Sequence, residues 1–331
     1  MSAGITSVLA PRGGTLELGG TLTQQRGTWR ETRWLFRHDR FAMTGLALVA
    51  LIAVLAIVAP LIALLVGHTP NQTFDAMVTA QGLPRGPSAS FLFGGDQVGR
   101  DVFVRTIYGA RTSLTVALTA AVVSTILGLL IGMVAGYYGG FVDVVLSRII
   151  DVFLALPILL FAISISTVAS VTTAGALGGL LKPGIGLVTA VIAFFSWPYL
   201  ARIVRGQVIA LREREFVQAA QVLGAGDARI MWHEVLPNVI SPVLVYLTLI
   251  VPSNVLFEAA LSYFGLGVPE STPSWGQMLA DATANSLFTY AWWMMLFPGL
   301  FLFITMLGFN LIGDGVRDAF DKTSGSAAAT G

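Results

Sequence analysis

Cysteine is missing from all 331 residues of the chain, and charged residues make up only 11%. Without thiols the chain forms no disulfide, no thiolate metal site and no cysteine nucleophile. Its two lysines, Lys182 and Lys322, belong to no GxxxxGK[ST] phosphate loop, which argues against ATP binding by this chain. The three histidines, His38, His68 and His233, are too scattered to form a metal-ligand cluster. With no GxSxG motif either, we expect a non-catalytic protein with no cofactor or metal of its own.

Apolar residues, by contrast, are abundant. They make up 55% of the chain and gather in several runs of about 20 residues, the length that a helix needs to cross the hydrocarbon core of a bilayer. Hydropathy therefore predicts an all-α membrane protein with six transmembrane helices. Their expected positions are 44–66, 113–135, 149–169, 185–204, 240–262 and 291–312.

Arginine placement predicts the orientation in the lipid bilayer. One group of arginines precedes the first span and another lies between the fourth and fifth, and an even number of crossings puts both groups on one side. By the positive-inside rule that side is the cytoplasm, so both termini are expected there. No basic stripe with interleaved aromatic residues is present, so no nucleic-acid partner is expected. The two groups are Arg26, Arg30, Arg33, Arg37 and Arg40, and Arg202, Arg205, Arg212, Arg214 and Arg229.

The chain divides into four expected segments. Residues 1–40 form a cytoplasmic, partly disordered tail, and 41–112 hold the first span and a long external loop. Residues 113–321 form a core domain of five spans with a cytoplasmic hairpin at 205–238, and 322–331 form a flexible tail. The later part of the loop stretch FGGDQVGRDVFVRTIYGARTSL is expected to form an amphipathic helix on the membrane surface, with Arg100, Arg105 and Arg111 on its polar side.

A stripe of small residues marks the second span. Gly128, Gly132 and Gly136 recur every four residues in GLLIGMVAG and so share one helix face. In lipid, helices associate through close backbone approach, which glycine permits. The stripe predicts a packing face, and the partner helix is expected either within this chain or in another subunit.

An acidic residue, Glu258, lies inside the fifth span. A charge there costs about 2.5 to 3.5 kcal/mol on insertion scales, so its side chain should face protein or water and have a partner. Two interpretations are open: a proton relay or pathway residue, and a structural acid held by a neighbouring helix. Ser253 and Asn254 lie one turn away and favour a polar patch that faces the bundle.

Between the fourth and fifth spans, FVQAAQVLGAGDARIMWHEVLPN interrupts the apolar pattern. Residues 213–223 are good helix formers, Gly224 and Gly226 can end that helix, and Asp227 can cap a second one. Pro237 suits the start of the fifth span, where its missing N–H is not needed. We therefore predict a helical hairpin tied to a transmembrane helix.

Paired small residues make this hairpin a candidate docking element. Ala219 and Ala220 give a low-relief surface that fits a groove on another protein; the alternative is an ordinary basic juxtamembrane loop. The segment resembles the coupling motif of ABC-importer permeases, written EAA, three residues, G, nine residues, I, one residue, LP. The matching positions are Gln218, Ala219, Ala220, Gly224, Leu236 and Pro237.

Two positions depart from that motif. Gln218 replaces the acidic residue and Glu234 replaces the isoleucine. A glutamine forms hydrogen bonds but no ion pair, so a salt bridge to a partner from this position is not expected. Glu215, one turn earlier, is a candidate substitute.

The resemblance extends over about residues 30–321. Segments such as GYYGGFVDVVLSRIIDVFLALP, FEAALSYFGLGV and FPGLFLFITMLGFNLIGDGVRDAFD look like the C-type permease of dipeptide, oligopeptide and nickel ABC importers. That family implies a six-helix, MetI-like fold in the bacterial plasma membrane and a B-type permease partner. It also implies two cytoplasmic ATPase subunits, which carry ATP and Mg, and an external solute-binding protein.

Other functions stay open from the residues alone. A peptide is the substrate that the resemblance favours, with a nickel complex or another small solute as the alternative. A secondary transporter or channel would also span the membrane six times, although such proteins usually hold several intramembrane ionisable residues. An ATP-independent scaffold would use the hairpin to bind something other than an ATPase.

Overall fold

The computed structural model describes residues 33–171 and 184–329, so most of the predicted N-terminal tail, 1–32, lies outside the described residues. Among these residues the fold is helical, and β-type pairing between extended segments is limited to isolated bridges. The long helices are α2 (Arg40–Val66), α3 (Val102–Tyr138), α6 (Ile185–Arg212), α9 (Leu236–Tyr263) and α11 (Trp293–Ala329). The shorter ones are α4 (Gly140–Ala155), α5 (Ile158–Val171), α7 (Glu215–Val222), α8 (Asp227–Ile230) and α10 (Trp275–Thr283).

Within residues 33–171 and 184–329, five helices are long and apolar enough to cross a membrane, and a sixth span results if α4 and α5 count as one. The third span expected at 149–169 falls on the second half of α4 and on α5, with a bend between them. The chain bends by 85° between α4 and the first turns of α5, because Leu156 is extended and Pro157 follows it. Proline disfavours helical backbone in the residue before it and donates no helical hydrogen bond.

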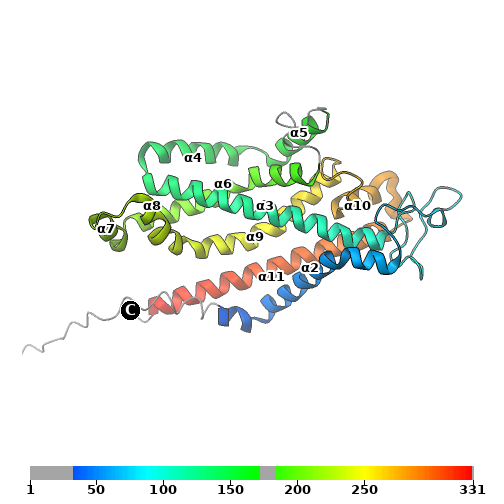
Figure 1. The fold of residues 1–331 in the computed structure, drawn as a ribbon, viewed down its shortest axis with the longest axis horizontal. Coiled ribbons are helices and arrows are strands. Elements are labelled where there is room, and N and C mark those ends of the chain that lie inside the picture. Colours follow the sequence, from blue (N-terminus) through cyan, green and yellow to red (C-terminus); the bar gives the residue numbers. More distant parts are fainter. Residues whose placement is uncertain (1–32, 172–183, 330–331) are drawn as a thin grey trace, which may run out of the picture.

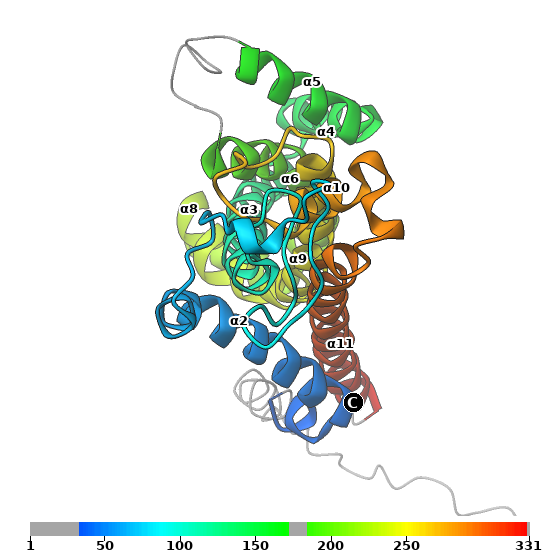
Figure 2. The same ribbon diagram turned by 90° about the vertical axis from the view of Figure 1, so that its right-hand side faces the viewer.

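The helices form three groups around the long axis. Seen end-on in Figure 2, α3, α6 and α9 occupy the centre, α2 and α11 lie on one side, and α4 and α5 lie on the other. Small buried residues bring the central helices together: Ala110, Ala117 and Ala121 of α3 belong to the same apolar cluster as Val251 and Val255 of α9. The core therefore lies along α3.

The predicted surface helix after the first span is absent. Residues 102–112 are the first turns of α3, which crosses the expected boundary between 112 and 113. Asp101 caps this helix by accepting hydrogen bonds from the backbone N–H groups of Phe103 and Val104. Arg105, expected on a water-facing side, is only 1% exposed. Inside the protein its Nη1 donates to the Pro70 carbonyl and to Asn71 Oδ1, and its Nε lies 3.7 Å from Asp96 Oδ2.

The C-terminal end also differs from the prediction. The last span was expected at 291–312 and a flexible tail at 322–331, yet α11 stays helical from Trp293 to Ala329. No proline follows Pro298 in this stretch, and residues 327–329 are alanines, the strongest helix formers.

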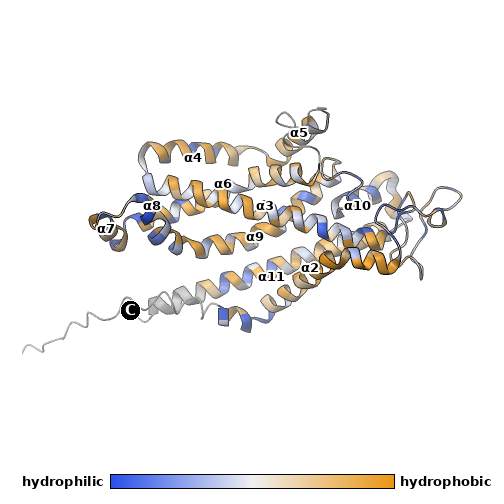
Figure 3. Cartoon of the chain, viewed as in Figure 1, coloured by the Kyte–Doolittle hydropathy of each residue, from blue (hydrophilic) through white to orange (hydrophobic). Residues whose placement is uncertain are grey.

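The elongated bundle has two different ends (Figure 1). The hairpin end consists of α7, α8 and the adjoining helix termini. The loop end consists of the 67–101 segment, the 264–274 connection and α10. Between the ends the helices are mostly hydrophobic, whereas hydrophilic residues gather around α8 and near α10 (Figure 3). This distribution is that of a chain crossing a bilayer with both ends in water.

Candidate functional site

The hairpin between α6 and α9 is shorter than predicted. Residues 205–212 of the expected hairpin are the last turns of α6, and α7 begins at Glu215 after a break at Glu213 and Arg214. After the turn, α8 continues through a π-helical stretch, Met231–Val235, directly into α9. The second arm of the hairpin is therefore the beginning of a 37-residue helix, Asp227–Tyr263.

Gly224 makes the turn between the two arms. Its φ is +80°, a conformation that residues with a Cβ rarely adopt. The N–H of Ala225 donates to the carbonyl of Ala220, and the N–H of Gly224 donates to that of Gln221. This is the Schellman arrangement, which satisfies the last carbonyls of a helix. The residue type at position 224 thus fixes the direction in which the chain returns.

Buried apolar residues anchor the hairpin to the bundle. Val217 of α7, Ile230 of α8 and Val235 after it are fully buried. They pack in one cluster with Val208 of α6 and Tyr137 at the end of α3. One apolar cluster therefore joins both arms of the hairpin to two membrane-length helices.

Polar contacts add two further ties. The Tyr137 hydroxyl donates to Asp227 Oδ1 at 3.1 Å. The predicted capping role of Asp227 is wrong, because Gly226 holds the cap position and Asp227 is the first helical residue. Gln218 Nε2 donates to the Glu213 carbonyl at 3.3 Å. A carboxylate could not make that bond, because it has no donor.

The two paired alanines face different surroundings. Ala219 is exposed, whereas Ala220 is half-buried and packs against the apolar cluster beneath the hairpin. The surface available to a partner is therefore Ala219 together with the turn. Glu215 and Gln218 are exposed on the same short helix.

Sequence reasoning missed the most prominent apolar residues of the hairpin. Val222 and Leu223, immediately before the turn, are 87% and 86% exposed, and Phe216 and Trp232 are also exposed. Apolar side chains at the tip of a polar end form a patch typical of an interaction surface. The signal was present in the sequence as a Val-Leu pair directly before the turn glycine.

Leu236 and Pro237 follow the π-helical stretch. Leu236, half-buried, donates its N–H to the carbonyl of Met231, five residues back. Pro237, exposed, follows the π-helical stretch within the continuous helix Asp227–Tyr263 and donates no backbone hydrogen bond there. Both positions lie on the route from the hairpin to the span.

The glycine stripe of α3 faces α6 of the same chain. A Cβ built on Gly128, Gly132 or Gly136 would lie 2.8, 2.6 or 2.7 Å from its nearest neighbour, each on α6. Backbone and side-chain atoms of α6 occupy that space, including the carbonyl oxygens of Trp197 and Ala201. In the described chain this face is used for internal packing.

Glu258 is fully buried in α9. Its two carboxylate oxygens accept hydrogen bonds from the hydroxyls of Ser113 of α3 and Ser262 of α9, both at 2.7 Å. Hydroxyl donors from two helices satisfy an acid that would otherwise be costly in the membrane. This arrangement supports the structural interpretation over a proton relay, because neither partner is an acid or a histidine.

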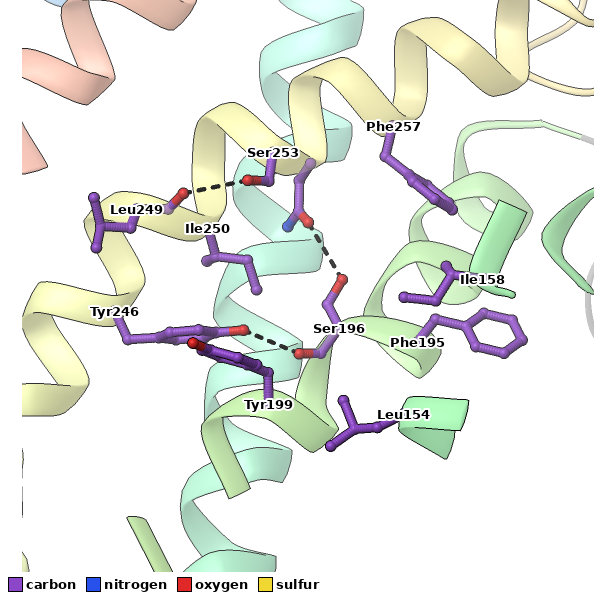
Figure 4. Close-up of a pocket in the computed structure, with 11 residues that line it drawn as sticks. Leu154, Ile158, Phe195, Ser196, Tyr199, Tyr246, Leu249, Ile250, Ser253 and Phe257 are labelled. Atoms are coloured by element: carbon purple, nitrogen blue, oxygen red, sulfur yellow. Dashed lines mark hydrogen bonds between the residues drawn. The ribbon is translucent and has the colours of Figure 1, made fainter. Parts of the chain in front are cut away.

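Ser253 and Asn254 of the fifth span differ in burial. Asn254 is buried and bridges α9 to its neighbours: its Nδ2 donates to the Ala117 carbonyl, and its Oδ1 accepts from Ser196. Ser253 is exposed. Both residues line a pocket of about 420 Å³ between α9, α6 and the α4–α5 break (Figure 4).

The loop end contains a buried cluster of charges. Arg100 Nε donates to Asp96 Oδ2 at 2.6 Å, and Arg100 Nη2 lies 3.5 Å from Asp281 Oδ2. Arg105 Nε lies 3.7 Å from the same Asp96 oxygen. Burial raises the pKa of Asp281, an effect that Arg100 and Arg105 oppose. These ion pairs join the 67–101 segment to α3 and α10.

Comparison with known proteins adds the family context. Residues 128–324 match the model of the binding-protein-dependent transport system inner membrane component. Residues 27–82 match the N-terminal TM domain of oligopeptide transport permease C.

Individual relatives match over most of their length. The chain is 40% identical to the oligopeptide transport system permease protein OppC of Escherichia coli K12, over 89% of this chain and 91% of the relative. It is 38% identical to the dipeptide transport system permease protein DppC of Alkalihalophilus pseudofirmus, over 88% and 89%. A chain from an inward-facing structure of the MetNI methionine ABC transporter superposes with a TM-score of 0.52 at 17% identity, covering 66% of this chain and 96% of that one. The last match confirms the expected fold.

Proposed function

The chain belongs to the family of binding-protein-dependent transport system inner membrane components, and from that premise we propose that it is the C-type permease subunit of an ABC importer for peptides. The family gives it the role of a multi-pass membrane component without catalytic chemistry of its own. The observation that carries the more specific proposal is the hairpin: a rigid element, anchored to α3 and α6, with an exposed apolar tip.

Peptides are the favoured cargo because of the named relatives. The Escherichia coli and Alkalihalophilus pseudofirmus proteins are described as oligopeptide and dipeptide permeases and cover about nine tenths of this chain. A nickel complex or another small solute is the second candidate. Against it stands the absence of any group of three or more metal-ligating side chains among the residues that the structure describes.

Four partners complete the proposed importer. A B-type permease pairs with this chain around one translocation path, two ATPases bind the hairpin end, and a solute-binding protein delivers the peptide at the loop end. The hairpin end then faces the cytoplasm, as the arginines of α6 and the hairpin favour. ATP and Mg belong to the ATPases.

Coupling in this assembly is mechanical. When ATP draws the two ATPases together, the surface formed by Ala219 and Leu223 moves with them. The apolar cluster around Val217 and Ile230 transmits the movement to α3, α6 and α9. Since this chain supplies no chemistry, the two conformations must differ in their affinity for the ATP-bound ATPases.

Two measurements on one pair of strains test the proposal. Cells lacking the chain are compared with cells complemented by a tagged copy for uptake of radiolabelled trialanine and of a nickel–histidine complex, and the proteins that copurify with the tag in mild detergent are identified. We expect trialanine uptake to depend on the chain, and ATPases and a second permease to copurify. The proposal would be overturned if only nickel uptake depended on the chain. It would also be overturned if no ATPase copurified in a preparation that keeps other membrane complexes intact.

A further inference from the structure

We propose that the pocket between α4, α6 and α9 is a transit site that holds the main chain of a peptide through Ser253, Asn254 and Ser196. This proposal rests on the peptide-importer function and adds the substrate-contacting residues to it. The pocket has a volume of about 420 Å³, within the range of about 300 to 1,000 Å³ typical of small-ligand sites.

Three features of the bundle create the pocket. Leu154 and Ile158 lie on either side of the α4–α5 break and form one wall. The chain bends by 85° at this break. The remaining lining residues come from α6 and α9 and converge on that space (Figure 4): Phe195, Ser196, Tyr199, Tyr246, Leu249, Ile250, Ser253, Asn254 and Phe257.

The polar groups of the pocket are neutral and weakly engaged. Ser196 Oγ donates to Asn254 Oδ1 at 3.3 Å, Asn254 Nδ2 donates to the Ala117 carbonyl at 3.4 Å, and Ser253 Oγ donates to the Leu249 carbonyl at 3.5 Å. All three distances are at the long limit for hydrogen bonds. A substrate with its own donors and acceptors can therefore replace these contacts at little cost.

Such groups match a peptide main chain. Amides and hydroxyls both donate and accept hydrogen bonds, as peptide N–H and C=O groups require. None of the residues that line the pocket is acidic, basic, histidine or cysteine. The pocket therefore has no ligand set for a metal ion, which prefers carboxylate, imidazole or thiolate, and no counter-charge for an isolated ion.

The walls are suited to variable side chains. Tyr199 and Tyr246 stack with their ring centroids 5.7 Å apart, and the Tyr246 hydroxyl is held by the Ser196 carbonyl at 3.2 Å. Phe195 and Phe257 form another part of the lining. Aromatic surfaces contact many side chains through dispersion and stacking without selecting one. Fixed main-chain contacts beside tolerant walls are what a carrier of diverse peptides needs.

The absence of cysteine makes a direct test possible. Ser253→Cys places a single thiol in the pocket, and Thr119→Cys places one on an exposed face of α3 that does not line it; both native hydroxyls donate to the carbonyl four residues earlier. Each variant of the complete transporter is treated with a maleimide in membrane vesicles, with and without trialanine, binding protein and ATP. Labelling is read on the tagged permease.

We expect trialanine to slow labelling of residue 253 by at least about threefold and to leave residue 119 unchanged. We also expect Ser253→Leu, which fills the pocket, to lower trialanine uptake by about tenfold or more, with its ATPases still bound, whereas Thr119→Leu retains uptake. Equal labelling at residue 253 with and without peptide, in vesicles whose wild-type transporter imports trialanine, would overturn the site alone. Failure of the wild type to import trialanine would overturn the peptide function and the site together.

Discussion

The two ends of the molecule hold their shape by different means. At the loop end, buried Asp96 forms ion pairs with both Arg100 and Arg105 inside the protein, although Nη2 of each arginine has no hydrogen-bond partner. At the hairpin end, buried residues are apolar, and apolar Val222 and Leu223 remain exposed. The loop end also exposes Leu92, at 55%, but the hairpin tip exposes two adjacent apolar side chains, Val222 and Leu223, at 87% and 86%. A patch of exposed apolar side chains is typical of a surface that binds a partner. The difference supports the proposal that the hairpin is the docking end.

Removing Asp96 should have the largest effect. Asp96→Ala deprives Arg100 of its 2.6 Å partner and takes away the carboxylate nearest Arg105. Breaking one side of a buried charge pair costs about 3 to 5 kcal/mol. We expect the thermal unfolding temperature of the detergent-purified protein to fall markedly.

Asp75→Ala is the matched control, since Asp75 is an exposed acid of the same segment. It should change stability by less than about 0.5 kcal/mol. Equal unfolding temperatures for the two variants would contradict the view that internal charge pairing holds the loop end.

A change at the hairpin turn should lower stability less than Asp96→Ala does but should strongly reduce peptide uptake. In Gly224→Val, a β-branched residue must adopt a φ of +80°, which costs about 1 to 2 kcal/mol locally. We expect the chain to insert into the membrane normally while peptide uptake falls, because the tip is displaced from its partner. Uptake in cells and the amount of membrane-inserted protein provide the two readouts.

Gly226→Val controls for the loss of a neighbouring glycine. Gly226 has an ordinary extended backbone with φ −71°, and no atom lies within 4 Å of an added Cβ at either position. This variant should retain uptake. If both variants transported equally well, the turn would have no role in docking.

The smallest expected effect concerns pH at the loop end. Because burial raises the pKa of Asp281 above its ordinary value, the folded protein binds this proton more tightly than the unfolded chain. Stability is therefore lost as pH rises from the ordinary pKa through the raised one. Asp281→Asn should lack that part of the pH dependence in thermal unfolding measured from about pH 4 to pH 7. A variant profile parallel to that of the wild type would show that Asp281 contributes nothing to it.

Much of the bundle could be predicted from local sequence. Apolar runs located the long helices, and the glycine at position 224 located the hairpin turn, because both signals depend on residues close together in the chain. The size of the bend before α5, 85°, could not be predicted from Pro157 alone, since proline inside a membrane helix is often tolerated.

Long-range pairing explains the remaining errors. Arg105 looked like a surface residue because its acidic neighbours, Asp96 and Asp281, come from a turn and from a distant helix. Ala220 looked equivalent to Ala219, but the cluster that covers it is assembled from α3, α6 and α9. Hydropathy places leucine inside a protein or in lipid, so it does not predict that Leu223 is exposed. Only the position of Leu223 directly before the turn glycine indicated it.

The most direct test of the docking end is the recovery of ATPases with a tagged Leu223→Arg permease. Leu92→Arg is the control, because Leu92 is an exposed leucine at the loop end. Neither change should alter folding by more than about 0.5 kcal/mol. We predict that Leu223→Arg loses its ATPases by about tenfold or more while keeping the second permease, and that Leu92→Arg retains both. Full recovery of ATPases with Leu223→Arg would contradict the assignment of the hairpin tip as their docking surface.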